Sequence, residues 1–213
     1  MAQEFTVRRQ CGDIYQYVSA RASKLQGMYL SDSSRNWAAR QLAILRRTAS
    51  KPSGSVPDAW PIEFSGLPES LIGKGDAPSA GENAVCAALA LFAMHQQSQQ
   101  QGMHRSGEEY DIGAAVRRYM YLHKGGENLL DGELPRRFAA MSTADSFEEA
   151  LHHARQLIQL LKSDSLPIDY GRLARQLLVF QISYLRDGVR LEWGRAYARA
   201  KPIANENADE TKE

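Results

Sequence analysis

Among the adjacent arginines of this 213-residue chain, three pairs between residues 46 and 137 point most directly to chemistry by their type and spacing. A guanidinium group is a planar fork of N–H donors that can bind two oxygens of one phosphate. Contacts of this kind contribute affinity for a nucleic-acid backbone without reading its base sequence. Together with one lysine two turns beyond the second pair, they give our candidate nucleic-acid-binding residues: Arg46, Arg47, Arg117, Arg118, Lys124, Arg136 and Arg137.

The ordinary alternative for each pair is a solvated helix face with local ion pairs. Arg46-Arg47 would close a helix, where positive charge favours the helix dipole. Arg136-Arg137 instead follows Pro135, where we expect a helix to begin and where the dipole disfavours positive charge. The formal net charge of +1 is too small to indicate nucleic acid by itself. Dispersed arginines on the C-terminal helices nevertheless fit a surface that contacts phosphates; they are Arg155, Arg172, Arg175, Arg190, Arg195 and Arg199.

Signatures of catalysis and metal binding are absent from the sequence. It has no GxxxxGK[ST] loop, no HExxH pair and no GxSxG turn. His152 and His153 are adjacent, so on a helix they point about 100° apart and do not chelate one metal ion together. Cys11 and Cys86 fit small core residues. We therefore expect a protein that is not an enzyme and that has no cofactor and no metal.

Helical spacing positions these residues. The clearest helix is expected over Ser146–Lys162, with apolar residues at steps of three and four and a capping box of Ser146 and Glu149. The next helix begins near Asp169 and is expected to stop at Asp187-Gly188. A last helix over Val189–Ala200 would bury Leu191, Trp193 and Tyr197. Earlier helices are expected at Ile14–Met28, Ser33–Thr48, Asn83–Met94 and Tyr110–Lys124.

The sequence predicts an all-α fold of two packed helical bundles with about seven or eight helices and no significant sheet. The N-terminal bundle would span 1–124 and include a loop rich in proline and glycine at 49–81. The C-terminal bundle would span 135–201, and an acidic tail at 204–213 would be disordered. We expect Trp37, Trp60 and Trp193 in the core. Because no apolar run is long enough for a membrane span or a secretory signal, we expect a cytoplasmic protein.

Short segments in a fixed order complete the pattern between roughly residues 35 and 200. They are Ala43-Ile-Leu-Arg-Arg47 before a proline-rich loop, Val85–Met94, Ile112-Gly-Ala-Ala-Val116, Pro135-Arg-Arg-Phe138, Leu151–Lys162, Leu166-Pro-Ile-Asp-Tyr170, Leu173–Phe180 and Val189-Arg-Leu-Glu-Trp193. In these segments the chain resembles the CasB family, the small subunit of the type I-E CRISPR surveillance complex Cascade.

The resemblance implies a non-catalytic, all-helical subunit with specific partners. These are the backbone and large subunits of Cascade, the CRISPR RNA, the target DNA and a second copy of the same chain. Basic faces of the family help to hold the target strand and the displaced strand once the R-loop opens. Arg46, Arg47, Arg136 and Arg137 match basic positions of the family, whereas Arg117, Arg118 and Lys124 come from the reasoning on arginine pairs.

Two other functions stay open from the sequence. A helical adaptor that binds only protein would use the arginines in ordinary surface ion pairs. A helical enzyme would use scattered groups such as Glu82, His95 or His123 and would need a defined pocket with perturbed titrating groups.

Overall fold

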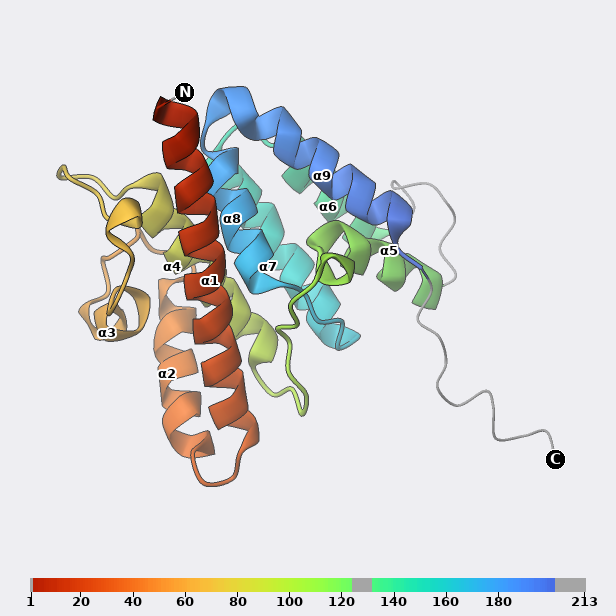
Figure 1. The fold of residues 1–213 in the computed structure, drawn as a ribbon. Coiled ribbons are helices and arrows are strands. Elements are labelled where there is room, and N and C mark those ends of the chain that lie inside the picture. Colours follow the sequence, from red (N-terminus) through yellow and green to blue (C-terminus); the bar gives the residue numbers. More distant parts are fainter. Residues whose placement is uncertain (1, 124–131, 202–213) are drawn as a thin grey trace.

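The computed structural model describes residues 2–123 and 132–201 of the chain, with side chains from residue 6 onward (Figure 1). The α-helices of these ranges are α1 (Ala2–Leu30), α2 (Arg35–Thr48), α3 (Trp60–Glu63), α4 (Ala80–Gln96), α5 (Ile112–Leu122), α6 (Glu133–Thr143), α7 (Phe147–Ser163), α8 (Tyr170–Phe180) and α9 (Arg186–Arg199). Short 3-10 turns lie at Pro57–Ala59, Glu69–Leu71, Glu108–Tyr110 and Ser183–Leu185. Within the described ranges the β-type pairing is limited to one isolated bridge between His104 and Ile168. The all-α prediction is confirmed.

Helix α4 forms the centre of the molecule because it is apolar on nearly every side, and its buried residues include Leu89 and Phe92. It packs against α1, α2, α7 and α8, while α1 also lies along α8 and α5 lies along α9 (Figure 1). One hydrophobic cluster runs from Ile14 on α1 to Trp193 on α9. Helices from both predicted bundles, 1–124 and 135–201, contribute to this cluster, and the division into two domains stays a prediction.

Side-chain caps begin the helices where the sequence predicted them. Ser146 accepts a hydrogen bond from the amide of Glu149 at 3.1 Å, and Asp169 accepts one from the amide of Arg172 at 3.0 Å. The Glu149 carboxylate reaches the amide of Asp145 instead of that of Ser146, so the expected box at α7 is shifted by one residue. The loop expected at 49–81 contains the short helix α3 and the 3-10 turns Pro57–Ala59 and Glu69–Leu71.

The boundary expected at Asp187-Gly188 is wrong. The chain leaves helical geometry earlier, at Ile182, and α9 begins at Arg186 with Asp187 in its first turn. Negative charge is favourable at that position because it faces the positive end of the helix dipole. A Cβ on Gly188 would meet nothing within 4 Å, so this glycine marks an exposed helical position and not a stop.

Several aromatic and aliphatic side chains expected in the core are exposed. Trp37 and Trp60 are 43% and 49% exposed, and Leu191 lies on the outside of α9. Trp193 is fully buried, as predicted. On α2 the buried stripe is Ala38, Leu42, Leu45 and Thr48, which places Trp37 one position outside it. The helical period was correct, but the face that meets α1 and α4 depends on tertiary packing.

Candidate nucleic-acid interface

The first arginine pair lies at the end of α2 and is divided between two environments. Arg47 forms an exposed ion pair with Asp58 of the proline-rich loop, at 2.9 Å. Arg46 is half-buried, and its burial lowers the pKa of its guanidinium. Its charge acts on Lys162 of α7, whose pKa is lowered first by burial and then by Arg46. Arg47 therefore has an acidic partner within the protein, whereas Arg46 faces another cation.

The second pair lies on α5, and each arginine contacts tyrosine rings. Arg117 lies 4.6 Å from the ring centre of Tyr121 and 5.2 Å from that of Tyr197, and it donates a hydrogen bond to the Tyr197 hydroxyl at 3.1 Å. Arg118 lies 5.3 Å from the ring centre of Tyr110. Cation–π contacts orient a guanidinium without neutralising it. Both arginines keep their full charge for an external anion.

The third pair lies in the first half of α6. Arg136 is exposed, and Arg137 forms an ion pair with Glu133 one turn earlier, at 3.7 Å. Glu133 lies in the first turn, so its charge favours the helix dipole and offsets part of the cost of the arginines. An exposed i, i+4 pair of this length is weak, which leaves Arg137 available to a phosphate. Lys124, the seventh candidate, lies outside the described residues.

The pairs fall into two groups in space. Helix α5 packs against both α6 and α9, so the second and third pairs lie on neighbouring helices. The first pair belongs to α2, which packs against α1 and α4. The second and third pairs therefore lie on helices that contact each other, and Arg46-Arg47 lies on a helix that belongs to another part of the packing.

A groove of about 740 Å³ runs between α5 and α9. Its cations are Arg118 from α5, Arg172 from α8, Arg195 and Arg199 from α9, and Lys201 beyond the end of α9. Arg195 and Arg199 are four residues apart and so share one face of α9. In the part of the chain that the structure describes, no ion pair involves Arg118, Arg195, Arg199 or Lys201.

Most of the acids that line the groove already have partners. Glu192 is bound by both Arg172 and Arg175, and Glu108 lies 3.5 Å from Arg172. Asp111 is 1% exposed and accepts hydrogen bonds from Gln176 at 2.6 Å and from the amide of Gly113 at 2.9 Å. Burial raises the pKa of Asp111 to about 6, so part of its charge is lost near neutral pH. The cations on α5 and α9 are thus the less compensated charges of the groove.

Arginines on the C-terminal helices divide into structural and exposed ones. Arg190 donates hydrogen bonds to the carbonyls of Ser142 and Ala144, and Arg186 donates one to the carbonyl of Asp145. Both arginines therefore supply donors to backbone carbonyls at and just after the end of α6. Arg155 donates to the carbonyl of Ala49 at 2.8 Å, after the end of α2. Arg195 and Arg199 form no hydrogen bonds of this kind to backbone carbonyls in the described part of the chain. The i, i+4 spacing of Arg195 and Arg199 was the sequence signal that could have singled them out as site residues.

The residues proposed for an enzyme have structural roles. Glu82 completes a capping box with Ser79 at the start of α4. His95 is buried and hydrogen-bonded to Tyr170 at 2.9 Å, and His123 pairs with Asp164. Across residues 2–123 and 132–201, no cluster of three or more metal-ligating side chains could hold an ion. None of the helices in these ranges has the length and hydropathy of a membrane span.

Comparison with solved structures places this arrangement among known folds. The chain is similar to CasB from Thermobifida fusca, with 29% identity over 87% of this chain and 97% of that one and a TM-score of 0.67. It is also similar to a CRISPR-associated protein of the Cse2 family from Thermus thermophilus, with 25% identity over 87% and 98% of the two chains and a TM-score of 0.60.

A chain of a structure described as a CRISPR RNA-guided surveillance complex has the same fold, with 20% identity over 87% and 94% of the two chains and a TM-score of 0.63. No curated protein matches this sequence significantly. The family model for the CRISPR-associated protein Cse2 matches residues 41–197, which is well over half of the chain. The chain therefore belongs to the Cse2 family of CRISPR-associated proteins, the family that also includes CasB.

Proposed function

We propose that this protein is the non-catalytic small subunit of a type I-E CRISPR RNA-guided surveillance complex. The observation that carries the proposal is the family match over residues 41–197. It is supported by a fold shared with a chain of such a complex over 94% of that chain. The partners are then the backbone and large subunits, the CRISPR RNA, the target DNA and a second copy of this chain.

We propose further that the subunit holds nucleic-acid backbone and stabilises the target and displaced strands of the R-loop. Arg118, Arg195 and Arg199 support this because the described residues give them no acidic partner. Arg136 and Arg137 lie on α6, which packs against α5, the helix that carries Arg118. Opening an R-loop exchanges one duplex for another at nearly balanced free energy, so several weak, salt-screened phosphate contacts are enough to shift the equilibrium.

Contact with the backbone alone suits a subunit that must serve every guide sequence. Base readout needs a helix or strand placed in a groove, or aromatic side chains that stack on bases. The arginines of this interface lie along helix sides, and the tyrosines nearest to them, Tyr110, Tyr121 and Tyr197, contact guanidinium groups. We therefore expect affinity that depends on salt and not on base sequence.

The proposal is tested by binding of the full-length chain to two unrelated single strands and to a duplex across a salt titration. Backbone contact predicts equal affinities for the two sequences and a steep decrease with salt, with a slope of about −0.7 per phosphate contact on a single strand. Binding that distinguishes the two sequences would contradict the proposal. No binding at low salt, together with tight binding to a partner subunit, would favour the protein-only adaptor.

A further inference from the structure

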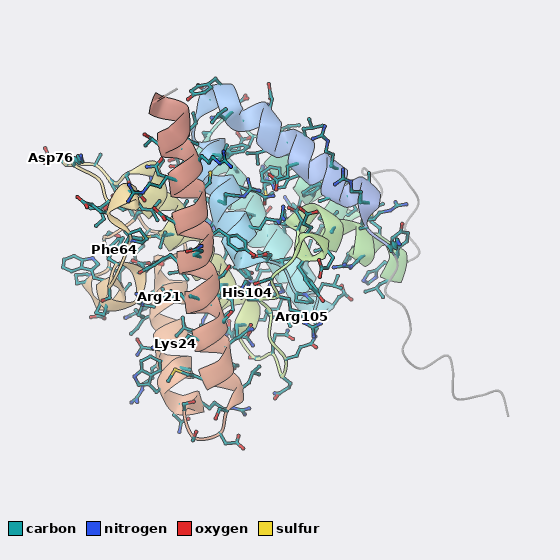
Figure 2. The ribbon with its side chains drawn as sticks, viewed as in Figure 1. Arg21, Lys24, Phe64, Asp76, His104 and Arg105 are labelled. Atoms are coloured by element: carbon teal, nitrogen blue, oxygen red, sulfur yellow. The ribbon has the colours of Figure 1, made fainter. Side chains whose placement is uncertain are left out.

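A smaller pocket of about 240 Å³ adjoins the groove, on the other side of Arg118. Its cations are Arg105, Arg118 and Lys201, and among the residues that the structure describes no acidic one lines it. Tyr110, Leu166 and Pro167 supply apolar walls. Arg105 lies on the segment that leads from α4 to α5, where Figure 2 labels it beside His104. We call this site the Tyr110 pocket.

The ring of Tyr110 holds two of the three cations in place. The guanidinium carbons of Arg105 and Arg118 lie 5.8 Å and 5.3 Å from its centre. The Tyr110 hydroxyl also accepts a hydrogen bond from Arg105 at 3.4 Å. Each of these contacts restricts a guanidinium without neutralising it.

The backbone beneath the pocket is fixed by hydrogen bonds to the segment before α8. The amide of Arg105 donates to the carbonyl of Ile168 at 3.1 Å, and the carbonyl of Tyr110 accepts from the amide of Asp169 at 2.7 Å. Because both ends of the 105–110 segment are tied to the same short stretch, Arg105 and Tyr110 keep their relative positions. The cations are therefore arranged before any ligand arrives, which reduces the cost of binding.

The charges of the pocket lack an internal counterion. In the ranges that the structure describes, none of its three cations forms an ion pair. Glu108, Glu109 and Asp111, which flank Tyr110 in the sequence, line the neighbouring groove, and Glu108 pairs with Arg172. Like charges held together repel one another, and an anion at their centre removes that repulsion.

We propose that the Tyr110 pocket binds one phosphodiester group of a single nucleic-acid strand, an inference that rests on the proposed function and specifies one of its contacts. Arg105, Arg118 and Lys201 would bind the phosphate oxygens, and Leu166 and Pro167 would contact the adjoining sugar. The volume is below the roughly 300 Å³ of a typical small-molecule pocket, which suits one backbone unit. The pocket adds Arg105 and Lys201 to the residues expected to contact nucleic acid.

The test measures binding of the full-length chain to a short labelled oligothymidylate across a salt titration. The pocket variant is Arg105→Gln with Arg118→Gln, and the control is Arg8→Gln with Arg40→Gln. The control removes two exposed charges that have no ion pair among the described residues and that do not line the pocket. We expect the pocket variant to bind about tenfold more weakly. Its salt slope should be smaller by about 0.7, the value for one phosphate contact. The control should change neither quantity by a comparable amount.

A second variant separates charge from orientation. Tyr110→Leu keeps all three cations, so its salt slope should stay unchanged while its affinity decreases by about tenfold, the value of the two cation–π contacts at that ring. Thermal melting of each variant shows whether the fold is intact, and both arginines are at the surface, where substitution is tolerated.

Each contrary outcome has a distinct meaning. If the pocket and control variants lose affinity equally, only net charge matters for binding, and the proposed phosphate site in the Tyr110 pocket is wrong. If Arg136→Gln with Arg137→Gln weakens binding but the pocket variant does not, the pocket is wrong and the proposed function stands. If the wild-type chain does not bind the strand, both fail. If inorganic phosphate stabilises wild type but not the pocket variant while strand binding is equal in the two, the site is for free phosphate and our assignment is wrong.

Discussion

The buried imidazole of His95 makes the stability of this fold sensitive to acid. His95 lies on α4 with no exposed surface, and its Nδ1 is hydrogen-bonded to the hydroxyl of Tyr170 at 2.9 Å. Burial, reinforced by the charge of Lys162, lowers the pKa of His95 from 6.5 to about 3.

The direction of the effect follows from proton uptake. As pH falls below 6.5, the unfolded chain protonates this imidazole, whereas the folded chain does not until about pH 3. Unfolding therefore takes up a proton throughout this window, and the free energy of unfolding decreases as pH falls. Each pH unit below the ordinary pKa of the imidazole lowers the free energy of unfolding by about 1.4 kcal/mol. At two pH units below that pKa, His95 therefore destabilises the fold by about 3 kcal/mol.

The measurement compares wild type with His95→Asn by urea denaturation between pH 7 and pH 4.5. Asparagine can keep the hydrogen bond to Tyr170 because its amide occupies the place of Nδ1, but it does not titrate. We expect the wild type to lose about 3 kcal/mol more than the variant over this range. Burial also raises the pKa of Asp111. Because both proteins contain Asp111, its contribution to the pH dependence of stability cancels in the difference. A difference in unfolding free energy that stays constant with pH would refute the reasoning.

Two glycine substitutions should have opposite effects on the free energy of unfolding, measured by urea denaturation. A Cβ on Gly171 of α8 would overlap Ser19 Oγ and lie 2.7 Å from the carbonyl of Tyr15, so Gly171→Ala should separate α8 from α1 and destabilise the fold by about 1–3 kcal/mol. Gly12 lies inside α1 with nothing within 4 Å of its Cβ position, so Gly12→Ala should stabilise the fold by about 1 kcal/mol. If Gly171→Ala instead stabilised the fold, α1 and α8 would be able to move apart at little cost in free energy, and the prediction would be wrong.

Local features of the fold could be predicted because they depend on neighbours in the sequence. The apolar stripe of α7 and its cap at Ser146 involve residues three or four apart, and the structure reproduces both. The end of α8 could not be predicted, because Asp187-Gly188 suits an exposed first turn as well as a stop. The exposure of Trp37 and Trp60 depends on which helix face meets α1 and α4, and no local pattern carries that information.

The candidate site was predictable in type but not in arrangement. Adjacent arginines predict surfaces that can bind phosphate, and the structure places all of those described on helices. Sequence could not reveal that Asp58 compensates Arg47 from a loop eleven residues away, or that Arg172 and Arg175 share Glu192. Nor could it show that Arg105, in a glutamine-rich interruption, meets Arg118 at the ring of Tyr110. These contacts join residues that only the tertiary fold brings together.

The central claim, that this subunit holds strands through their backbone, is tested most directly in an assembled surveillance complex containing it. The measurement is the affinity of that complex for a matched target duplex, with Arg136→Ala and Arg137→Ala in the subunit and its amount in the complex verified. We expect weaker target binding, a smaller dependence on salt and unchanged thermal stability of the free subunit. Unchanged affinity in a complex with the normal amount of the double variant would contradict the role of the α6 arginines.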